Sequence, residues 1–135
     1  MIKYSRQRES IMNALMDRTD HPTAETIYNE IKEDYPKISL GTVYRNLTLL
    51  EELGKVQKIS TEYGPDRFDY NVVPHCHFTC RECKGVSDLP FELHGEFLAR
   101  VMESFDGRVE KCSILLSGVC PKCTRKLKQQ EDNTN

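Results

Sequence analysis

The chain has 135 residues, of which 38% are hydrophobic and 30% charged, and its net charge is −2. This composition is typical of a globular protein rather than a disordered one, and no apolar run approaches the roughly 20 residues of a membrane span. The first residues are polar and basic, unlike a secretion signal, so we expect a cytoplasmic protein with no membrane partner. The net charge gives no support to nucleic-acid binding, which would need local clusters of Lys and Arg.

Residues 5–34 carry the pattern of two helices. Ser5 and Thr23 are suitable N-caps, one before each helix, and Pro22 separates the helices because it cannot continue the first one. The second helix is expected over residues 24–34. The apolar residues at helical spacing are Ile11, Ala14 and Leu15 in the first helix, and Ile27, Tyr28 and Ile31 in the second.

A third helix is predicted to open at Ser39 and to end at Gly54, its expected C-cap. The residues expected to face inward are Val43, Leu47, Leu50 and Leu53. Two short strands follow, at 56–59 and 68–70, with a turn at Gly64-Pro65-Asp66. Three helices and a hairpin form the layout of a winged-helix domain, and the short link between the second and third helices is that of a helix-turn-helix.

The segment from Asn71 to Pro74 is the expected hinge, so we predict two domains, 1–72 and 73–135. Elements expected in the second are strands at 78–79, 86–89 and 109–117, a helix at 91–105, and a tail helix from Pro121. Ser113–Val119 is the most apolar segment of the chain and is predicted to be a central strand. The polar end, 129–135, is predicted to be frayed. The fold class is therefore α+β.

Four of the six cysteines form two Cys-x-x-Cys pairs, Cys80 with Cys83 and Cys120 with Cys123. A cytoplasmic chain keeps its thiols reduced, so a disulfide framework is not expected. Incidental thiols or redox-active dithiols are the alternatives, but two such pairs match the closure of a zinc ribbon. Because thiolates fill all four positions of a tetrahedron, we predict a structural Zn²⁺.

A second group of possible metal ligands lies around the first cysteine pair. His75 and His77 are two residues apart, so in a strand they point to the same side. Asp69 and Asp88 are hard oxygen donors on either side of them. His21 lies far away in sequence, and a histidine before a proline is more often a helix-entry residue than a ligand.

The order of these motifs resembles the ferric uptake regulator family, and the resemblance covers nearly the whole chain. The matching strings are His21–Ile27, Ile38–Leu47, Arg67-Phe68-Asp69, His75-x-His77-x-x-Cys80-x-x-Cys83 and Gly118-Val119-Cys120-x-x-Cys123. The resemblance implies a homodimeric repressor, not an enzyme, that binds a palindromic operator in double-stranded DNA. It also implies an N-terminal winged-helix domain, a C-terminal α/β dimerisation domain and a regulatory metal between the two. The regulatory ligands that it implies are His21, Asp69, His75, His77 and Asp88.

The ligand types separate the branches of the family. Iron-uptake regulators usually carry Glu at positions 69 and 88, and zinc-uptake regulators tend to carry Cys in place of Asp69. Asp at both positions resembles the peroxide-sensing branch, whose ligand set suits Fe²⁺ or Mn²⁺. In that branch Fe(II) reacts with hydrogen peroxide and a ligand histidine is oxidised, which releases DNA; His21 and His75 match the oxidised histidines. The alternative is an iron-responsive repressor of metal-uptake genes.

The third helix should lie in the major groove. Tyr44 and Arg45 are the expected readers of base edges or phosphates, with Ser39 and Thr42 at the start of the helix. The basic residues expected to contact phosphates are Lys3, Arg6, Arg8 and Lys55. Except for Arg45, each single Lys or Arg is better explained as a solvated surface charge.

Cys76, Cys112 and Pro74 stand where many relatives carry ligands of a further metal site. We expect that this site is lost and that both cysteines are buried as small apolar residues. His94, in the fourth predicted helix, is expected at the surface. Of the rival classes, a metal-dependent hydrolase or oxygenase leaves the helix-turn-helix without a purpose. A zinc-ribbon interaction module leaves the aspartates unexplained.

Overall fold

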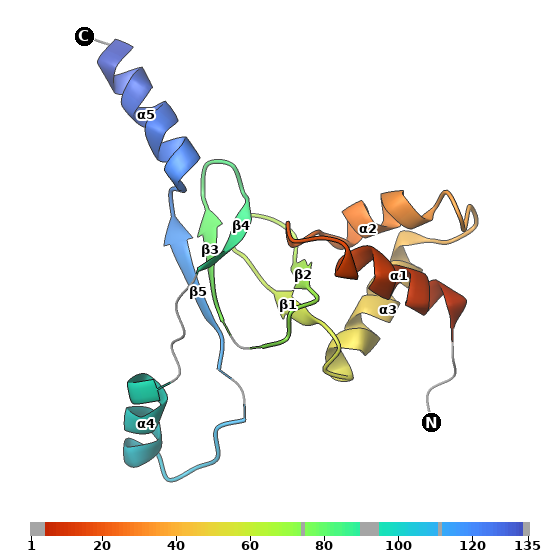
Figure 1. The fold of residues 1–135 in the computed structure, drawn as a ribbon, viewed down its shortest axis with the longest axis horizontal. Helices are drawn as coiled ribbons and strands as arrows, with labels where there is room; N and C mark the ends of the chain where they lie inside the picture. The colour runs from red at the N-terminus through yellow and green to blue at the C-terminus, as the bar shows by residue number, and fades with distance from the viewer. Residues whose placement is uncertain (1–4, 74, 90–94, 111, 134–135) are drawn as a thin grey trace. The chain divides into compact units, whose positions relative to one another are not determined.

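A computed structural model describes residues 5–73, 75–89, 95–110 and 112–133 (Figure 1). The chain forms two compact units, Met1–Val72 and Val73–Asn135. Both helices and strands are present, as the α+β prediction requires. The first unit contains α1 (Arg6–Met16), α2 (Ala24–Ile31), α3 (Leu40–Glu52), β1 (Gln57–Ile59) and β2 (Arg67–Asp69). The second contains β3 (Cys76–Cys80), β4 (Val86–Leu89), α4 (Gly95–Ser104), β5 (Ile114–Gly118) and α5 (Pro121–Asn133).

The three helices of the first unit begin at the predicted capping residues. The side-chain oxygens of Ser5, Thr23 and Ser39 each accept a hydrogen bond from the backbone N–H three residues later, at 3.2, 3.2 and 3.1 Å. Each bond satisfies one of the N–H groups that have no partner inside the helix. The sequence therefore fixes where these helices start by local chemistry alone.

The inward faces of α1, α2 and α3 form one apolar core together with Phe68 of the hairpin. Leu53 was predicted to join this core, and this is wrong, because its side chain is 44% exposed. α3 ends at Glu52, and Gly54 takes a left-handed φ of 72°, so Leu53 lies at the turn that ends the helix. α2 ends at Ile31, earlier than expected, and the chain continues in hydrogen-bonded turns to Tyr35.

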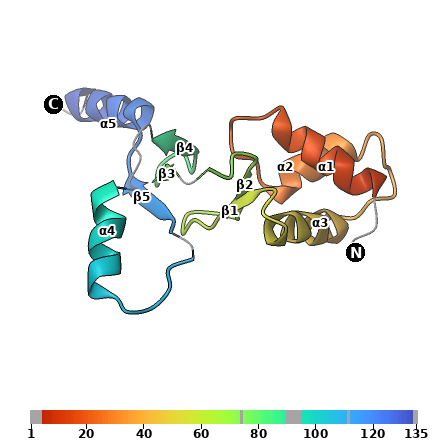
Figure 2. The same ribbon diagram turned by 60° about the horizontal axis from the view of Figure 1, so that its bottom comes forward.

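The two strands of the first unit pair antiparallel, with Gln57 opposite Asp69 and Ile59 opposite Arg67. The hairpin directly follows α3 (Figure 2). The other edge of β2 pairs with the segment before α2, where Thr23 forms an isolated antiparallel bridge with Arg67. The N–H of Phe68 also donates to the carbonyl of Pro22 at 3.0 Å. This pairing brings the entry to α2 beside the strand that carries Asp69.

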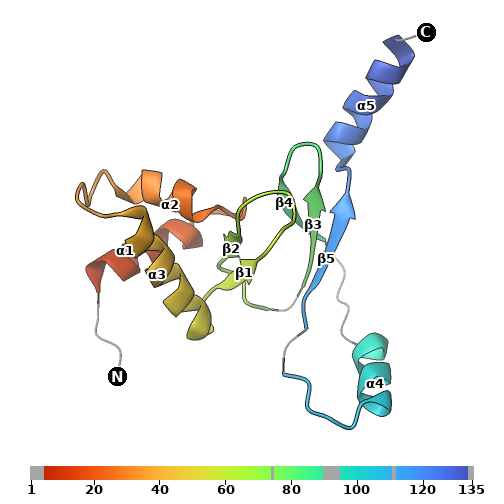
Figure 3. The same cartoon turned by 180° about the vertical axis from the view of Figure 1, so that it is seen from behind.

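The second unit has a three-stranded sheet in the order β4-β3-β5, with β3 antiparallel to β4 and parallel to β5 (Figure 3). The prediction of a central strand at 113–119 is wrong, because β5 lies at an edge. Leu115 and Leu116 of β5 are 37% and 49% exposed. The central strand is β3. It contains the buried polar residues His77 and Thr79, so its sequence is less apolar than is usual for a central strand.

The C-terminal part also differs from expectation. The strand expected at 109–117 is confined to Ile114–Gly118, and α5 runs to Asn133 through most of the segment predicted to be frayed. That segment is polar but contains Gln and Glu, which are good helix formers. The predicted first residues of the fourth helix, including His94, lie outside the described residues. In the described parts of the chain, no helix is both long enough and apolar enough to cross a membrane.

Candidate metal centres

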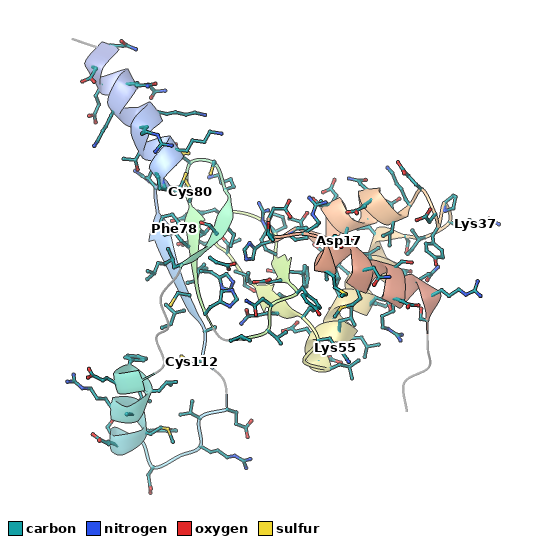
Figure 4. All side chains as sticks on the ribbon, in the orientation of Figure 1. Asp17, Lys37, Lys55, Phe78, Cys80 and Cys112 are labelled. Carbon is teal, nitrogen blue, oxygen red and sulfur yellow. The ribbon has the colours of Figure 1, made fainter. Side chains whose placement is uncertain are left out.

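The four cysteines of the two Cys-x-x-Cys pairs come together at one end of the sheet in the second unit. Cys80 is the last residue of β3 and Cys83 lies in the turn after it, while Cys120 precedes α5 and Cys123 lies in its first turn. All four sulfurs lie within 4.8 Å of one another. Figure 4 labels Cys80 where β3 ends, beside the start of α5.

The turn that joins the first pair is shaped by backbone hydrogen bonds. Lys84 takes a left-handed φ of 64°, and its N–H donates to the carbonyl of Cys80 at 2.9 Å. The N–H of Cys80 in turn donates to the carbonyl of Gly85 at 3.0 Å. The N–H of Arg81 donates to the carbonyl of Gly118 at 2.8 Å, which ties this turn to the end of β5. The sheet register therefore sets the distance between the two pairs.

The thiols of the quartet differ in acidity. Burial opposes ionisation of Cys80, but hydrogen bonds from the backbone N–H groups of Cys83, Cys120 and Glu82 outweigh it and lower the pKa of this thiol to about 6. A hydrogen bond with the Cys120 side chain, followed by burial, raises the pKa of Cys123 to about 12. One thiol is thus readily ionised while its neighbour holds its proton, since like charges this close repel.

This donor set fits Zn²⁺. Four cysteine sulfurs are soft ligands in the number that a tetrahedral structural site takes, and they leave no open position for a substrate. Of the two remaining cysteines, Cys76 is buried, as expected, but Cys112 is only half-buried, so the prediction of burial is wrong for it. Cys112 lies at the end of the sheet away from Cys80 (Figure 4).

The other end of β3 carries a cluster of two histidines and one carboxylate. His77 lies directly opposite Asp88 across the β3–β4 pair, and its Nε2 is 3.2 Å from Asp88 Oδ1. The Nε2 of His75 is 2.7 Å from the same oxygen. The two imidazole rings lie 4.2 Å apart between centroids. The prediction that both histidines approach one point is thus matched by their placement within this unit.

The tautomer of His75 follows from its hydrogen bond to the backbone. Its Nδ1 lies 2.6 Å from the carbonyl oxygen of Val73, and a carbonyl only accepts, so Nδ1 carries the hydrogen. Its Nε2, 2.7 Å from Asp88 Oδ1, is then the nitrogen that can bind a metal when it carries no hydrogen. Ligand histidines in metal sites are usually oriented by such a bond.

The first unit holds a separate pair of possible ligands. His21 is buried and its Nε2 lies 3.2 Å from Asp69 Oδ2. The other carboxylate oxygen of Asp69 accepts a hydrogen bond from the N–H of Asn71 at 2.9 Å. His21 has a left-handed φ of 53°, which is uncommon for a residue other than glycine. The sequence did not reveal this backbone conformation.

The donor chemistry of these two groups fits a metal of the iron or manganese type. Neutral imidazole nitrogens and carboxylate oxygens are the mixture that Fe(II) and Mn(II) accept, and two histidines with one carboxylate form a known arrangement for non-haem iron. Within the first unit, His21 and Asp69 offer one nitrogen and one oxygen of the same types. All five residues are of types that bind metal: histidine does so as the neutral imidazole and aspartate as the ionised carboxylate.

The start of α3 carries the residues predicted to contact DNA. Ser39, Tyr44 and Arg45 are exposed and Thr42 is half-buried. A guanidinium nitrogen of Arg45 donates to Thr42 Oγ1 at 3.0 Å, and this oxygen is also 2.9 Å from Ser39 Oγ. Among the basic residues expected to contact phosphates, Arg6 and Lys55 are exposed and Arg8 is half-buried; Lys3 lies outside the described residues.

Two supporting contacts were missed from sequence. Arg8 donates through Nε to the side-chain oxygen of Asn46 at 3.2 Å, and this joins α1 to α3. Arg67 donates through Nη1 to the backbone carbonyl of His21 at 3.2 Å. The only sequence signal for the second contact is the position of Arg67 two residues before Asp69.

Comparison with known proteins agrees with this architecture. The model of the ferric uptake regulator family matches residues 1–116. The peroxide-responsive repressor PerR of Staphylococcus aureus (strain Mu50) is 33% identical over 127 residues, which are 93% of this chain and 84% of that protein.

Solved structures give the same result. The Campylobacter jejuni peroxide stress regulator is 34% identical with a TM-score of 0.75, over 87% of this chain and 88% of that one. The Helicobacter pylori ferric uptake regulator Fur is 21% identical, and the match covers 91% of this chain and 83% of that one. Its TM-score of 0.78 shows that the two proteins share a fold. The chain therefore belongs to the ferric uptake regulator family of dimeric, metal-responsive, DNA-binding transcriptional regulators.

Proposed function

We propose that this chain is a homodimeric repressor that binds a palindromic operator in its metal-loaded form and releases it when hydrogen peroxide oxidises one of its histidines. Residues 1–72 serve as the winged-helix DNA-binding domain and residues 73–135 as the dimerisation domain. A two-fold dimer presents two copies of α3 to two half-sites, which is why a palindrome is the expected target. The protein acts in the cytoplasm.

In this proposal the two metal centres have different tasks. The cysteine quartet holds a structural Zn²⁺. The regulatory ion, Fe²⁺ or Mn²⁺, takes ligands from both units: His21, Asp69, His75, His77 and Asp88. An ion that needs both units shifts the equilibrium between their arrangements toward one of them, which is the requirement for a co-repressor.

The observation that carries the peroxide-sensing proposal is the nature of the five ligands. Three imidazoles and two short carboxylates, Asp69 and Asp88, leave room for a sixth ligand around an ion that prefers six. The similarity to the peroxide-responsive repressor of S. aureus and to the peroxide stress regulator of C. jejuni supports the same assignment. In the second unit, the hydrogen bond from His75 Nδ1 to Val73 keeps Nε2 available as a ligand atom.

The chemistry expected of the chain falls on its histidines. When bound, Fe(II) would activate hydrogen peroxide without being consumed, chemistry that Mn(II) does not readily supply, and the histidine ring would be the net two-electron reductant. The imidazole of His21 or His75 gains one oxygen atom of hydrogen peroxide, and the other oxygen leaves as water. The oxidised ring is a poorer ligand, so the regulatory ion is lost and the operator is released.

DNA contacts are proposed for the start of α3. Tyr44 and Arg45 are exposed there, and Ser39 and Thr42 supply hydroxyls near the helix start, where backbone N–H groups favour phosphate. The hydrogen bond from Arg45 to Thr42 holds the guanidinium close to the helix before DNA arrives. Arg45 is therefore the residue from which we expect the largest base or phosphate contribution.

The test is peroxide treatment of the zinc-containing protein loaded with either Fe(II) or Mn(II). Mass spectrometry should find one added oxygen atom on His21 or His75 in the iron-loaded protein, together with loss of operator binding. In the manganese-loaded protein, both histidines should remain unoxidised and the operator should stay bound. If iron-loaded protein binds the operator and keeps it under peroxide, the chain is instead an iron-responsive repressor of metal-uptake genes.

A further inference from the structure

The backbone of His21 is held in an uncommon conformation by β2, the strand that carries Asp69. The left-handed φ of 53° at His21 is intrinsically disfavoured for a side-chain-bearing residue. A conformation of this kind persists where the surroundings over-determine it. The contacts around His21 identify those surroundings.

Two consecutive carbonyl groups of this segment are bonded to β2. The carbonyl of Pro22 accepts from the backbone N–H of Phe68 at 3.0 Å, and the carbonyl of His21 accepts from Arg67 Nη1 at 3.2 Å. In a regular strand, successive backbone groups alternate in direction, so one neighbouring backbone cannot bond both carbonyls. The backbone of Phe68 therefore bonds the carbonyl of Pro22, and the long side chain of Arg67 reaches the carbonyl of His21.

The residue before His21, Asp20, is held by a different side chain, that of Arg18. Arg18 binds Asp20 through two hydrogen bonds, of 2.9 and 2.7 Å, and binds Glu30 of α2 at 3.1 Å. These groups are more exposed than the contact at Arg67: Asp20 and Glu30 have side chains 58% and 47% exposed. Exposed ion pairs contribute little because water screens them. Arg67 is therefore the more important of the two supports.

We propose that Arg67 is a positioning residue that sets His21 and Asp69 as a ligand pair before the metal binds. Arg67, Phe68 and Asp69 are consecutive in β2, so the strand that offers the carboxylate also fixes the backbone of the histidine. The Nε2 of His21 then lies 3.2 Å from Asp69 Oδ2. This inference rests on the proposed function, in which both residues bind the regulatory ion.

The experiment measures Mn(II) binding to the full-length, zinc-containing protein, with free Mn(II) followed by electron paramagnetic resonance. Arg67→Met keeps a long side chain but removes the donor. We expect Mn(II) affinity to fall by about tenfold or more, the usual effect of removing a group that orients a metal ligand. Arg18→Met is the matched control on the exposed support and should have a clearly smaller effect. Arg67→Lys, which keeps one donor, should recover part of the affinity.

A double-mutant cycle separates positioning from a general structural effect. In a His21→Ala background, Arg67→Met should weaken Mn(II) binding no further, because its effect passes through His21. An equal loss in both backgrounds, or unchanged affinity in Arg67→Met alone, overturns the proposal. If Arg67→Met does not purify with its zinc, the same cycle is run with Arg67→Lys. Unchanged Mn(II) binding in His21→Ala alone would instead contradict the proposed regulatory site and the positioning role with it.

Discussion

The two ends of β3 carry metal ligands of opposite character. Where the strand ends, Cys80 joins three other thiols within 4.8 Å, a set that is complete in number and uniform in type. Where it begins, His75 and His77 meet one carboxylate, Asp88, whose side chain is 48% exposed. A complete set of soft ligands suits a permanent ion, and an open set of nitrogen and oxygen ligands suits one that exchanges. One short strand thus carries two ligand sets, one suited to a permanent ion and one suited to an exchangeable ion.

The largest effect should come from the complete set. Cys120→Ser removes one of the four thiols proposed to hold zinc, and in structural zinc sites the binding energy of about 10–16 kcal/mol is also folding energy. We expect the variant to lose zinc and to be recovered as monomeric or aggregated protein, measured by metal analysis and size-exclusion chromatography. Cys112→Ser, at the other end of the sheet, is the control and should keep both zinc and the dimer. A folded, zinc-free dimer of Cys120→Ser would contradict the structural assignment.

The end suited to an exchangeable ion should respond without loss of the fold. His77→Ala removes a buried imidazole that faces Asp88, and we expect metal-stimulated operator binding to weaken by at least about tenfold, as for other losses at metal sites. Zinc content should stay at that of the wild type. The control is Ser87→Ala, an exposed neighbour of Asp88 on β4. Unchanged metal dependence of DNA binding in His77→Ala would show that the regulatory site lies elsewhere.

A smaller change sharpens the assignment of peroxide sensing. Asp88 Oδ1 lies within reach of both His75 and His77, so Asp88→Glu moves the carboxylate by one methylene but keeps the donor type. We expect metal-dependent DNA binding to persist while peroxide-induced oxidation of the histidines slows several-fold, because the longer side chain alters carboxylate coordination. The measurement is the rate at which His21 or His75 gains oxygen, followed by mass spectrometry. Oxidation at the wild-type rate would show that the length of this carboxylate has no role.

A thiol mechanism is the competing explanation for any peroxide response. Cys76 and Cys112 lie outside the cysteine quartet. Cys76 is buried and Cys112 is half-buried. The double variant Cys76→Ser, Cys112→Ser should release DNA at the same peroxide concentration as the wild type. Loss of sensitivity in this variant, with no oxygen added to either histidine in the wild type, would establish a cysteine-based mechanism in place of the iron-based one.

The smallest effect is expected at the exposed support of His21. The hydrogen bonds from Arg18 hold the pKa of Asp20 below its usual value. A carboxyl whose folded pKa is lowered stabilises the fold above its ordinary pKa, and this contribution is lost as pH falls through the folded pKa. Arg18→Gln should therefore destabilise the protein at pH 7 by less than about 1 kcal/mol. The difference in thermal stability from the wild type should persist down to the ordinary pKa of 3.8 and shrink as the pH is lowered below it.

The sequence predicts the first unit better than the second. Ser5, Thr23 and Ser39 cap their helices by contacts with the next turn, and such local chemistry is readable from a few residues. The place of β5 at a sheet edge is not local, because it depends on which strand pairs with β3. Its apolar residues suggested a central strand. An apolar segment is expected to be buried, but its sequence does not say which elements will pack against it.

The same division holds for the candidate sites. The spacing of two Cys-x-x-Cys pairs and of His75 and His77 indicates which residues approach one another, because tight turns and strand alternation fix their geometry. The left-handed backbone of His21 and its bond to Arg67 join residues separated by 46 positions. No periodicity spans that distance. Support of this kind becomes visible only when the chain is folded.

The cysteine quartet also sets the order of events during synthesis. Cys83 and Cys120 are 37 positions apart, and β3 cannot gain its parallel partner β5 until the intervening α4 has been made. The first unit is continuous in sequence and emerges from the ribosome earlier, so it can collapse around its own core while the sheet is still incomplete. All four thiols can close on one metal ion only when nearly the whole chain has been translated. A nascent chain stalled after Gly118 would therefore hold β3, β4 and β5 but lack Cys120 and Cys123, so its metal site could not close.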